Sequence, residues 1–139
     1  MEIKLKRLNQ NFHLEATGTN GRTVLIDAGP NDGGEDLGVR PMQLLLMGLG
    51  GCSSIDVISI LKKQRQEVED YSVEVTAERE KDKVPSLFTA IHVKFILTGK
   101  IEKEKLEHAI KLSLEKYCSV SKILGKTAPV TFSYTINGN

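Results

Sequence analysis

The segment LLLMGLGGCSSIDVISILKK, residues 44–63, decides the fold because it places one cysteine inside a long apolar helix pattern. Pro41 precedes the segment and suits the first position of a helix, where no amide hydrogen is needed. Lys62 and Lys63 suit the negative end of the helix dipole. We therefore predict a helix from about Pro41 to Gln64.

Apolar side chains cover most of the circumference of this predicted helix. They are Leu44, Leu45, Leu46, Met47, Leu49, Ile55, Val57, Ile58, Ile60 and Leu61. A helix that is apolar nearly all round must be buried nearly all round, and a chain of 139 residues offers few other elements to cover it. A second subunit would supply the missing cover. Gly48, Gly51 and Cys52 form a strip of small residues along which another helix could approach closely.

Shorter patterned segments flank the helix on both sides. Strand patterns occupy residues 3–8, 11–16, 23–28, 71–80, 87–99 and 129–136, and an amphipathic helix pattern at 101–117 precedes a short helical piece after Cys118. Asn20-Gly21 favours a type I′ hairpin turn, in which both residues need positive φ. Because hairpin strands dominate and no linker is visible, we predict one α+β domain over residues 1–139.

The composition excludes several classes of protein. The net charge is +1 and no long basic block is present, which argues against nucleic acid or a membrane surface as partner. The first ten residues lack the apolar core of a signal peptide. Ser53, Ser54, Asp56 and Ser59 interrupt the apolar run, so we expect no membrane span. The two cysteines lie far apart in the sequence, which favours free thiols in a reducing cytoplasm.

The two cysteines are the main source of reactive chemistry in this sequence. His13, His92 and His108 fall in three different predicted elements without metal-ligand spacing, and no phosphate-binding or dinucleotide-binding motif is present. We therefore predict no metal and no cofactor. From composition and spacing alone, Cys52 and Cys118 read more readily as buried core cysteines than as reactive thiols.

Two motifs change that balance. The segment RPMQLLLMGLGGCSSIDVISIL at 40–61, followed by LEKYCSVS at 114–121, resembles the OsmC/Ohr family of thiol-dependent peroxidases, most closely its YhfA-like branch. The resemblance covers almost the whole chain. It implies an intertwined homodimer in which antiparallel sheets wrap two buried central helices.

The resemblance also implies a reaction. Cys52 corresponds to the cysteine that attacks an organic hydroperoxide and becomes a sulfenic acid. Cys118 corresponds to the cysteine that resolves it as a disulfide, which an external dithiol reduces. Leu49 and Ile55 are then expected to provide an apolar substrate surface.

The activation of Cys52 is where this sequence departs from the family. Family peroxidases usually carry a glutamate where this chain has Met42, and that glutamate holds an arginine beside the thiolate. Arg22 is an approximate match to the arginine. Arg40 is the other choice, but it would lie about 18 Å from Cys52 along one helix, so only a partner subunit's copy could reach the thiol.

Asp56 adds a second complication because it lies four residues after Cys52 on the same helical face. A nearby carboxylate disfavours a thiolate unless a cation bridges both groups. Asp56 could instead hydrogen bond to another element or bind a substrate group. Two rival functions therefore stay open: a redox-responsive or ligand-binding dimer without efficient turnover, and a purely structural use of both cysteines.

Overall fold

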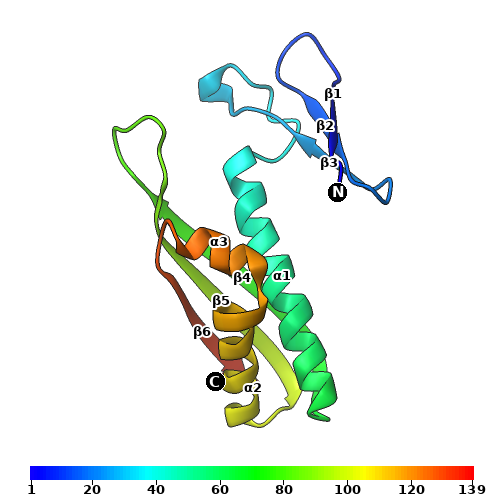
Figure 1. Ribbon diagram of the computed structural model, residues 1–139, viewed down its shortest axis with the longest axis vertical. Helices are drawn as coiled ribbons and strands as arrows, with labels where there is room; N and C mark the ends of the chain where they lie inside the picture. Colours follow the sequence, from blue (N-terminus) through cyan, green and yellow to red (C-terminus); the bar gives the residue numbers. More distant parts are fainter. The chain divides into compact units, whose positions relative to one another are not determined.

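The computed structural model describes residues 1–139 and divides into two compact units, Met1–Leu45 and Leu46–Asn139 (Figure 1). The chain order is three strands, a long helix, two strands, two shorter helices and a last strand, which confirms the predicted α+β order. The long helix α1, Pro41–Lys63, begins in the first unit and continues through the second. That the whole chain is one domain stays a prediction.

The first unit is a small antiparallel sheet followed by a loop. Its strands are β1 (Lys4–Arg7), β2 (Leu14–Thr17) and β3 (Thr23–Ile26), paired in that order. The predicted type I′ turn is wrong. Gly21 alone has positive φ, and its N–H donates to the carbonyl of Gly18, so the chain turns one residue earlier, over Gly18–Gly21. Asn20 does not adopt positive φ, and its side chain accepts a hydrogen bond from the N–H of Arg22, as in an Asx turn.

A buried carboxylate organises the loop that follows β3. The side chain of Asp27 accepts hydrogen bonds from the backbone N–H groups of Ala28, Glu35 and Leu37 at 2.7, 3.2 and 3.0 Å. Burial alone would raise its pKa, but the three backbone donors outweigh burial and lower the pKa of Asp27. Backbone groups near both ends of the glycine-rich segment 29–38 therefore hydrogen bond to this one side chain.

The second unit packs helices on a mixed sheet. Its strands are β4 (Glu67–Arg79), β5 (Phe88–Lys100) and β6 (Val130–Ile136), with β4 antiparallel and β6 parallel to β5. The crossover from β5 to β6 carries α2 (Lys103–Leu112), a π-helical turn (Ser113–Tyr117) and α3 (Ser119–Gly125), seen in front of the sheet in Figure 1. A parallel pair needs such a crossover, so β6 could not follow β5 directly. The expectation of purely antiparallel sheets is therefore wrong for the β5–β6 pair.

The core of this unit lies between one face of the sheet and the helices. From Ile91 to Leu97 every second residue of β5 is buried, as expected for a strand with one covered face. The largest fully buried side chains in the core are Leu49, Val57, Leu61, Ile91, Val93, Phe95, Leu97, Leu106 and Ile110. A Cβ on Gly50 would lie 3.3 Å from Val75, so the absence of a side chain there allows α1 to sit close to β4.

The opposite face of α1 is open in a single chain. Met47, Ile55 and Ile58 are 52%, 72% and 44% exposed. Gly51 faces open space, whereas Gly48 faces Val120 of α3 in the same chain, so the expected small-residue strip is only partly available to another helix. Burial of α1 by a second subunit stays a prediction.

The composition of α1 also bears on the membrane question. Contrary to the sequence argument, α1 is long and apolar enough to cross a membrane by length and composition alone. A helix in the core of a soluble protein passes the same test, and the Leu49–Leu61 side of α1 is core. The absence of a membrane partner therefore remains an expectation from the sequence.

Candidate functional site

Helix α1 carries two side chains of the candidate site. Cys52 and Asp56 are four residues apart, which places them one turn apart on the same face. Both are half-buried. Ser53 lies between them in sequence but faces the core, where its hydroxyl donates to the carbonyl of Leu49 at 2.8 Å.

A widened helical turn carries the second cysteine. The helix predicted over 101–117 is present from Lys103 to Tyr117, but only Lys103–Leu112 (α2) is α-helical and its last turn, Ser113–Tyr117, is π-helical. The N–H of Cys118 donates to the carbonyl of Ser113, five residues earlier, at 2.8 Å. Cys118 then leaves the helical conformation and caps α3, with its sulfur accepting from the N–H of Ser121 at 3.3 Å. π-Helical turns of this kind often occur at functional sites.

These two elements bring three reactive groups together. The Sγ atoms of Cys52 and Cys118 and a carboxylate oxygen of Asp56 all lie within 4.8 Å of one another. The hydroxyl of Ser113, on the π-helical turn, donates to Oδ2 of Asp56 at 2.9 Å. We call Cys52, Asp56 and Cys118 the thiol–carboxylate cluster.

The two thiols of the cluster differ in environment. Cys118 is fully buried, whereas Cys52 is only half-buried. Burial, and then the neighbouring Cys52, raise the pKa of the Cys118 thiol well above its ordinary value, against a smaller opposite effect of the Ser121 N–H. Cys118 is therefore a protonated thiol at neutral pH, and Cys52 is the thiol that solvent can reach.

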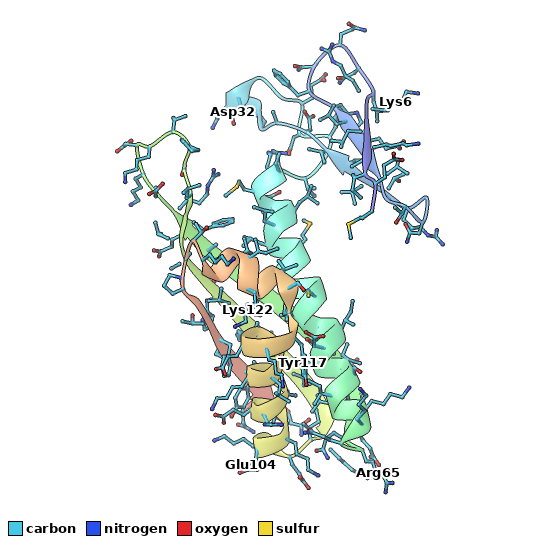
Figure 2. All side chains as sticks on the ribbon, viewed as in Figure 1. Lys6, Asp32, Arg65, Glu104, Tyr117 and Lys122 are labelled. Carbon is cyan, nitrogen blue, oxygen red and sulfur yellow. The ribbon has the colours of Figure 1, made fainter.

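A cleft opens beside the cluster. Its volume is about 600 Å³, and Asp56, Ser59, Ile60, Lys63, Leu112 and Tyr117 line it. Tyr117, labelled in Figure 2, stands at the junction of α2 and α3 next to Cys118. The cleft combines apolar walls with one carboxylate and one ammonium group, so a small, largely apolar molecule could approach the cluster from this side.

The other residues expected at the site are not members of the thiol–carboxylate cluster. Leu49 is fully buried in the core of the second unit, and Ile55 is 72% exposed on α1. Arg22 is exposed in the first unit, next to the turn after β2. Arg40, the other arginine considered, pairs with Asp36 at 2.6 Å within that unit. The roles of Arg22, Leu49 and Ile55 stay predictions.

Two serines that hold the site were missed by the sequence argument. Ser121 follows Cys118 by three residues, which is the spacing between a helix N-cap side chain and the N–H group that it accepts from. The sequence therefore carried a local signal for this contact. Ser113 interrupts the apolar pair Leu112 and Leu114, but its bond to Asp56 depends on how α2 packs on α1. No local pattern predicts that contact.

The OsmC-like protein family profile matches residues 33–133. Protein YhfA of Escherichia coli strain K12 is 45% identical over 117 residues, which are 84% of each chain.

Two solved structures extend the comparison. A hypothetical protein from Aquifex aeolicus VF5 is 33% identical with a TM-score of 0.80, over 98% of this chain and 96% of that one. The organic hydroperoxide resistance protein OhrB of Bacillus subtilis is 22% identical with a TM-score of 0.62, over 96% of each chain, and shows a shared fold. On the profile match and the identity to YhfA, this chain belongs to the OsmC-like protein family.

Proposed function

We propose that this protein is a thiol-dependent peroxidase that reduces organic hydroperoxides through Cys52 and Cys118. The observation that carries the proposal is the approach of the two sulfur atoms to within 4.8 Å, from helices far apart in the sequence. The name of the Bacillus subtilis structural neighbour, an organic hydroperoxide resistance protein, points to the same substrate class.

In the first step, Cys52 attacks the hydroperoxide. The sulfur takes the terminal peroxide oxygen, the O–O bond breaks, and the alkoxide leaves with a proton as an alcohol. Cys52 is thereby oxidised to a sulfenic acid, and the hydroperoxide is reduced. The half-exposed position of Cys52, against the full burial of Cys118, supports this assignment of the attacking thiol.

In the second step, Cys118 attacks the sulfenic sulfur of Cys52. A disulfide forms and the hydroxyl leaves with the proton of Cys118 as water. The sulfur atoms must close from within 4.8 Å to a bond of about 2.05 Å. Asp56 lies beside both sulfurs and is the carboxylate available to accept the Cys118 proton. An external dithiol then reduces the disulfide and returns both thiols.

The wider setting of this activity is also part of the proposal. We expect a cytoplasmic homodimer that uses the whole chain as one domain, with apolar side chains of α1 favouring organic over inorganic peroxides. Arg22 of one subunit would activate Cys52 in place of the usual arginine–glutamate pair, since Met42 cannot hold a guanidinium. No cofactor takes part in these steps.

One specific observation favours a second function. The hydrogen-bond donors to the cluster are Ser113 and Ser121, and no lysine or arginine of the second unit donates to it. Without a cation from elsewhere, Cys52 beside Asp56 would react slowly. The protein would then be a redox-responsive or ligand-binding dimer with one slow oxidation and little turnover.

Peroxide consumption by the reduced full-length chain tests these functions. With an alkyl hydroperoxide and dithiothreitol, we expect multiple turnovers in the wild type and none in Cys52→Ser. Cys118→Ser should be oxidised at Cys52 yet form no intramolecular disulfide, as seen by mass spectrometry. Oxidation without turnover in the wild type would favour the sensor function, and unreactive thiols would exclude both.

A further inference from the structure

The thiol–carboxylate cluster also has the composition of a metal site. Two sulfur atoms and one carboxylate oxygen meet from α1 and from the start of α3, within the second unit. Borderline-soft Zn²⁺ accepts this mixture of thiolate and carboxylate ligands, whereas Mg²⁺ and Ca²⁺ prefer oxygen alone. The histidines take no part: His92, for example, hydrogen bonds to Thr131 and Ser133 on β6.

The spacing of the three ligand atoms is close to what zinc requires. With Zn–S and Zn–O bonds of about 2.3 and 2.0 Å, the ligand atoms of a tetrahedral site lie about 3.5–3.8 Å apart. The three atoms of the cluster are already within 4.8 Å of one another, so they need to close by only about 1 Å to reach that spacing. We propose that Cys52, Asp56 and Cys118 bind one Zn²⁺, with a water molecule as the fourth ligand.

The hydrogen bonds around the cluster are of the kind that orient metal-binding side chains. Ser113 donates to Oδ2 of Asp56 and so fixes the orientation of the carboxylate, while Oδ1 remains available. The N–H of Ser121 points at the sulfur of Cys118 and stabilises negative charge there. Outer hydrogen bonds of this kind orient the ligands of metal sites.

Charge balance favours a dication in this position. Zinc binding would displace the thiol protons, and the two positive charges of Zn²⁺ would offset the negative charge of the sulfur and carboxylate ligands. The cleft lined by Asp56 and Tyr117 offers an entry path, since Cys118 itself is fully buried. Zinc would hold both sulfurs, so binding and disulfide formation exclude each other.

This inference rests on the geometry of the cluster and not on the proposed peroxidase activity. The experiment is a titration of the reduced, metal-free full-length chain with Zn²⁺ in competition with a chromophoric chelator. We expect one Zn²⁺ per chain and no binding after disulfide formation. Cys52→Ser, Cys118→Ser and Asp56→Asn should each weaken binding by at least about tenfold. The matched control Asp70→Asn changes an exposed residue of β4 and should bind Zn²⁺ as the wild type does.

A second measurement removes dependence on the folding of the variants. Co²⁺ added to the wild type should give thiolate-to-cobalt charge transfer of the intensity expected for two sulfur ligands, and Zn²⁺ should protect Cys52 from alkylation. No binding, one sulfur ligand, or binding that survives both Cys52→Ser and Asp56→Asn would overturn the site. Zinc binding without peroxide turnover would uphold the site and refute the peroxidase, and turnover without zinc binding would do the reverse.

Discussion

At the scale of single residues, the environment of Cys118 controls the second half of the proposed reaction. Burial, and then the adjacent Cys52, raise the pKa of this thiol, so it is protonated at neutral pH and ionises only as the solution becomes alkaline. Disulfide formation depends on the thiolate fraction. While the pH stays below that pKa, the rate of the resolving step should therefore rise by about tenfold for each unit by which the pH increases.

Rapid mixing of peroxide-oxidised protein at several pH values, followed by acid quench and mass spectrometry, measures this step. The Cys118→Ser variant should keep the Cys52 sulfenic acid at every pH and serves as the control. A resolving rate that does not change between neutral and alkaline pH would mean that ionisation of Cys118 does not limit disulfide formation.

A second prediction at this scale concerns Asp56 itself. A carboxylate oxygen of Asp56 lies within 4.8 Å of the Cys52 sulfur, so its negative charge repels negative charge that develops on the sulfur during alkylation. Asp56→Asn should speed alkylation of Cys52 by up to about tenfold at neutral pH, equivalent to about 1.4 kcal/mol. Arg22→Ala should slow alkylation if that arginine supports the thiolate.

Iodoacetamide labelling in the Cys118→Ser background follows Cys52 alone, and Asp70→Asn controls for a general change in charge. If the alkylation rate is the same with and without Arg22, then Arg22 is an exposed turn residue that does not influence the Cys52 thiol. The same rate with and without Asp56 would show that its hydrogen bond to Ser113 already neutralises its influence.

At the scale of elements, the contact between α1 and β4 depends on one glycine. A Cβ on Gly50 would lie 3.3 Å from Val75 and 3.6 Å from Val73, so a larger side chain must push the helix away. Gly50→Leu should lower the free energy of unfolding by about 1–3 kcal/mol. Urea denaturation measures the loss, and Gly125→Leu on α3, where a Cβ would meet nothing within 4 Å, is the matched control. Equal changes in the free energy of unfolding for the two variants would show that helix propensity, and not packing against β4, causes the effect.

The loop after β3 gives a prediction on acid stability. The lowered pKa of Asp27 means that its carboxylate stabilises the folded state above the unfolded value of about 3.9, and that this stabilisation is lost as the pH falls through the lower folded value. Asp27→Ala should lower the protection factors of the amides of residues 28–37 at neutral pH and reduce the further loss of protection on acidification. Unchanged exchange in the variant would contradict the anchoring role of this carboxylate.

The elements that the sequence predicted well are those with strong local patterns. The helix from Pro41, the β4–β5 hairpin and the final strand follow from apolar periodicity and flanking turn residues. The π-helical turn at Ser113–Tyr117 has no such signal, because the same apolar spacing fits an ordinary helix. The turn before β3 also differs, since Asn20 satisfies a local backbone donor with its side chain.

The site was predictable to a similar degree. The two thiols came from a family resemblance, and the proximity of Asp56 to Cys52 came from helical spacing. That all three meet, and that Ser113 holds the carboxylate, depends on how α2 and its widened turn pack against α1. Such a contact joins residues distant in the sequence and leaves no periodic trace.

At the scale of the whole molecule, the open face of α1 predicts assembly. Met47, Ile55 and Ile58 expose 52%, 72% and 44% of their surfaces along one helix, and a second chain is the proposed cover. Sedimentation at low micromolar concentration should therefore show a dimer. The double variant Ile55→Glu, Ile58→Glu should be a folded monomer, because both side chains are already solvent-exposed in one chain.

Ile123→Glu, an equally apolar and exposed position on α3, is the control and should leave the dimer intact. A monomeric wild type would refute the proposed assembly. So would a double variant that remains a dimer.

The π-helical turn has a consequence for how chains of this family can diverge in length. A π-helical turn takes one more residue than an α-helical turn over the same axial distance. Deleting one residue from 113–117 would let this segment close as a regular α-helical turn of about the same length, so the chain after it would keep its direction. Cys118 would then still approach Cys52, whereas the same deletion within the regular helix α2 would rotate everything after it by about 100°. A gap of a single position is therefore compatible with a paired second cysteine when it falls in 113–117, and not when it falls in 103–112.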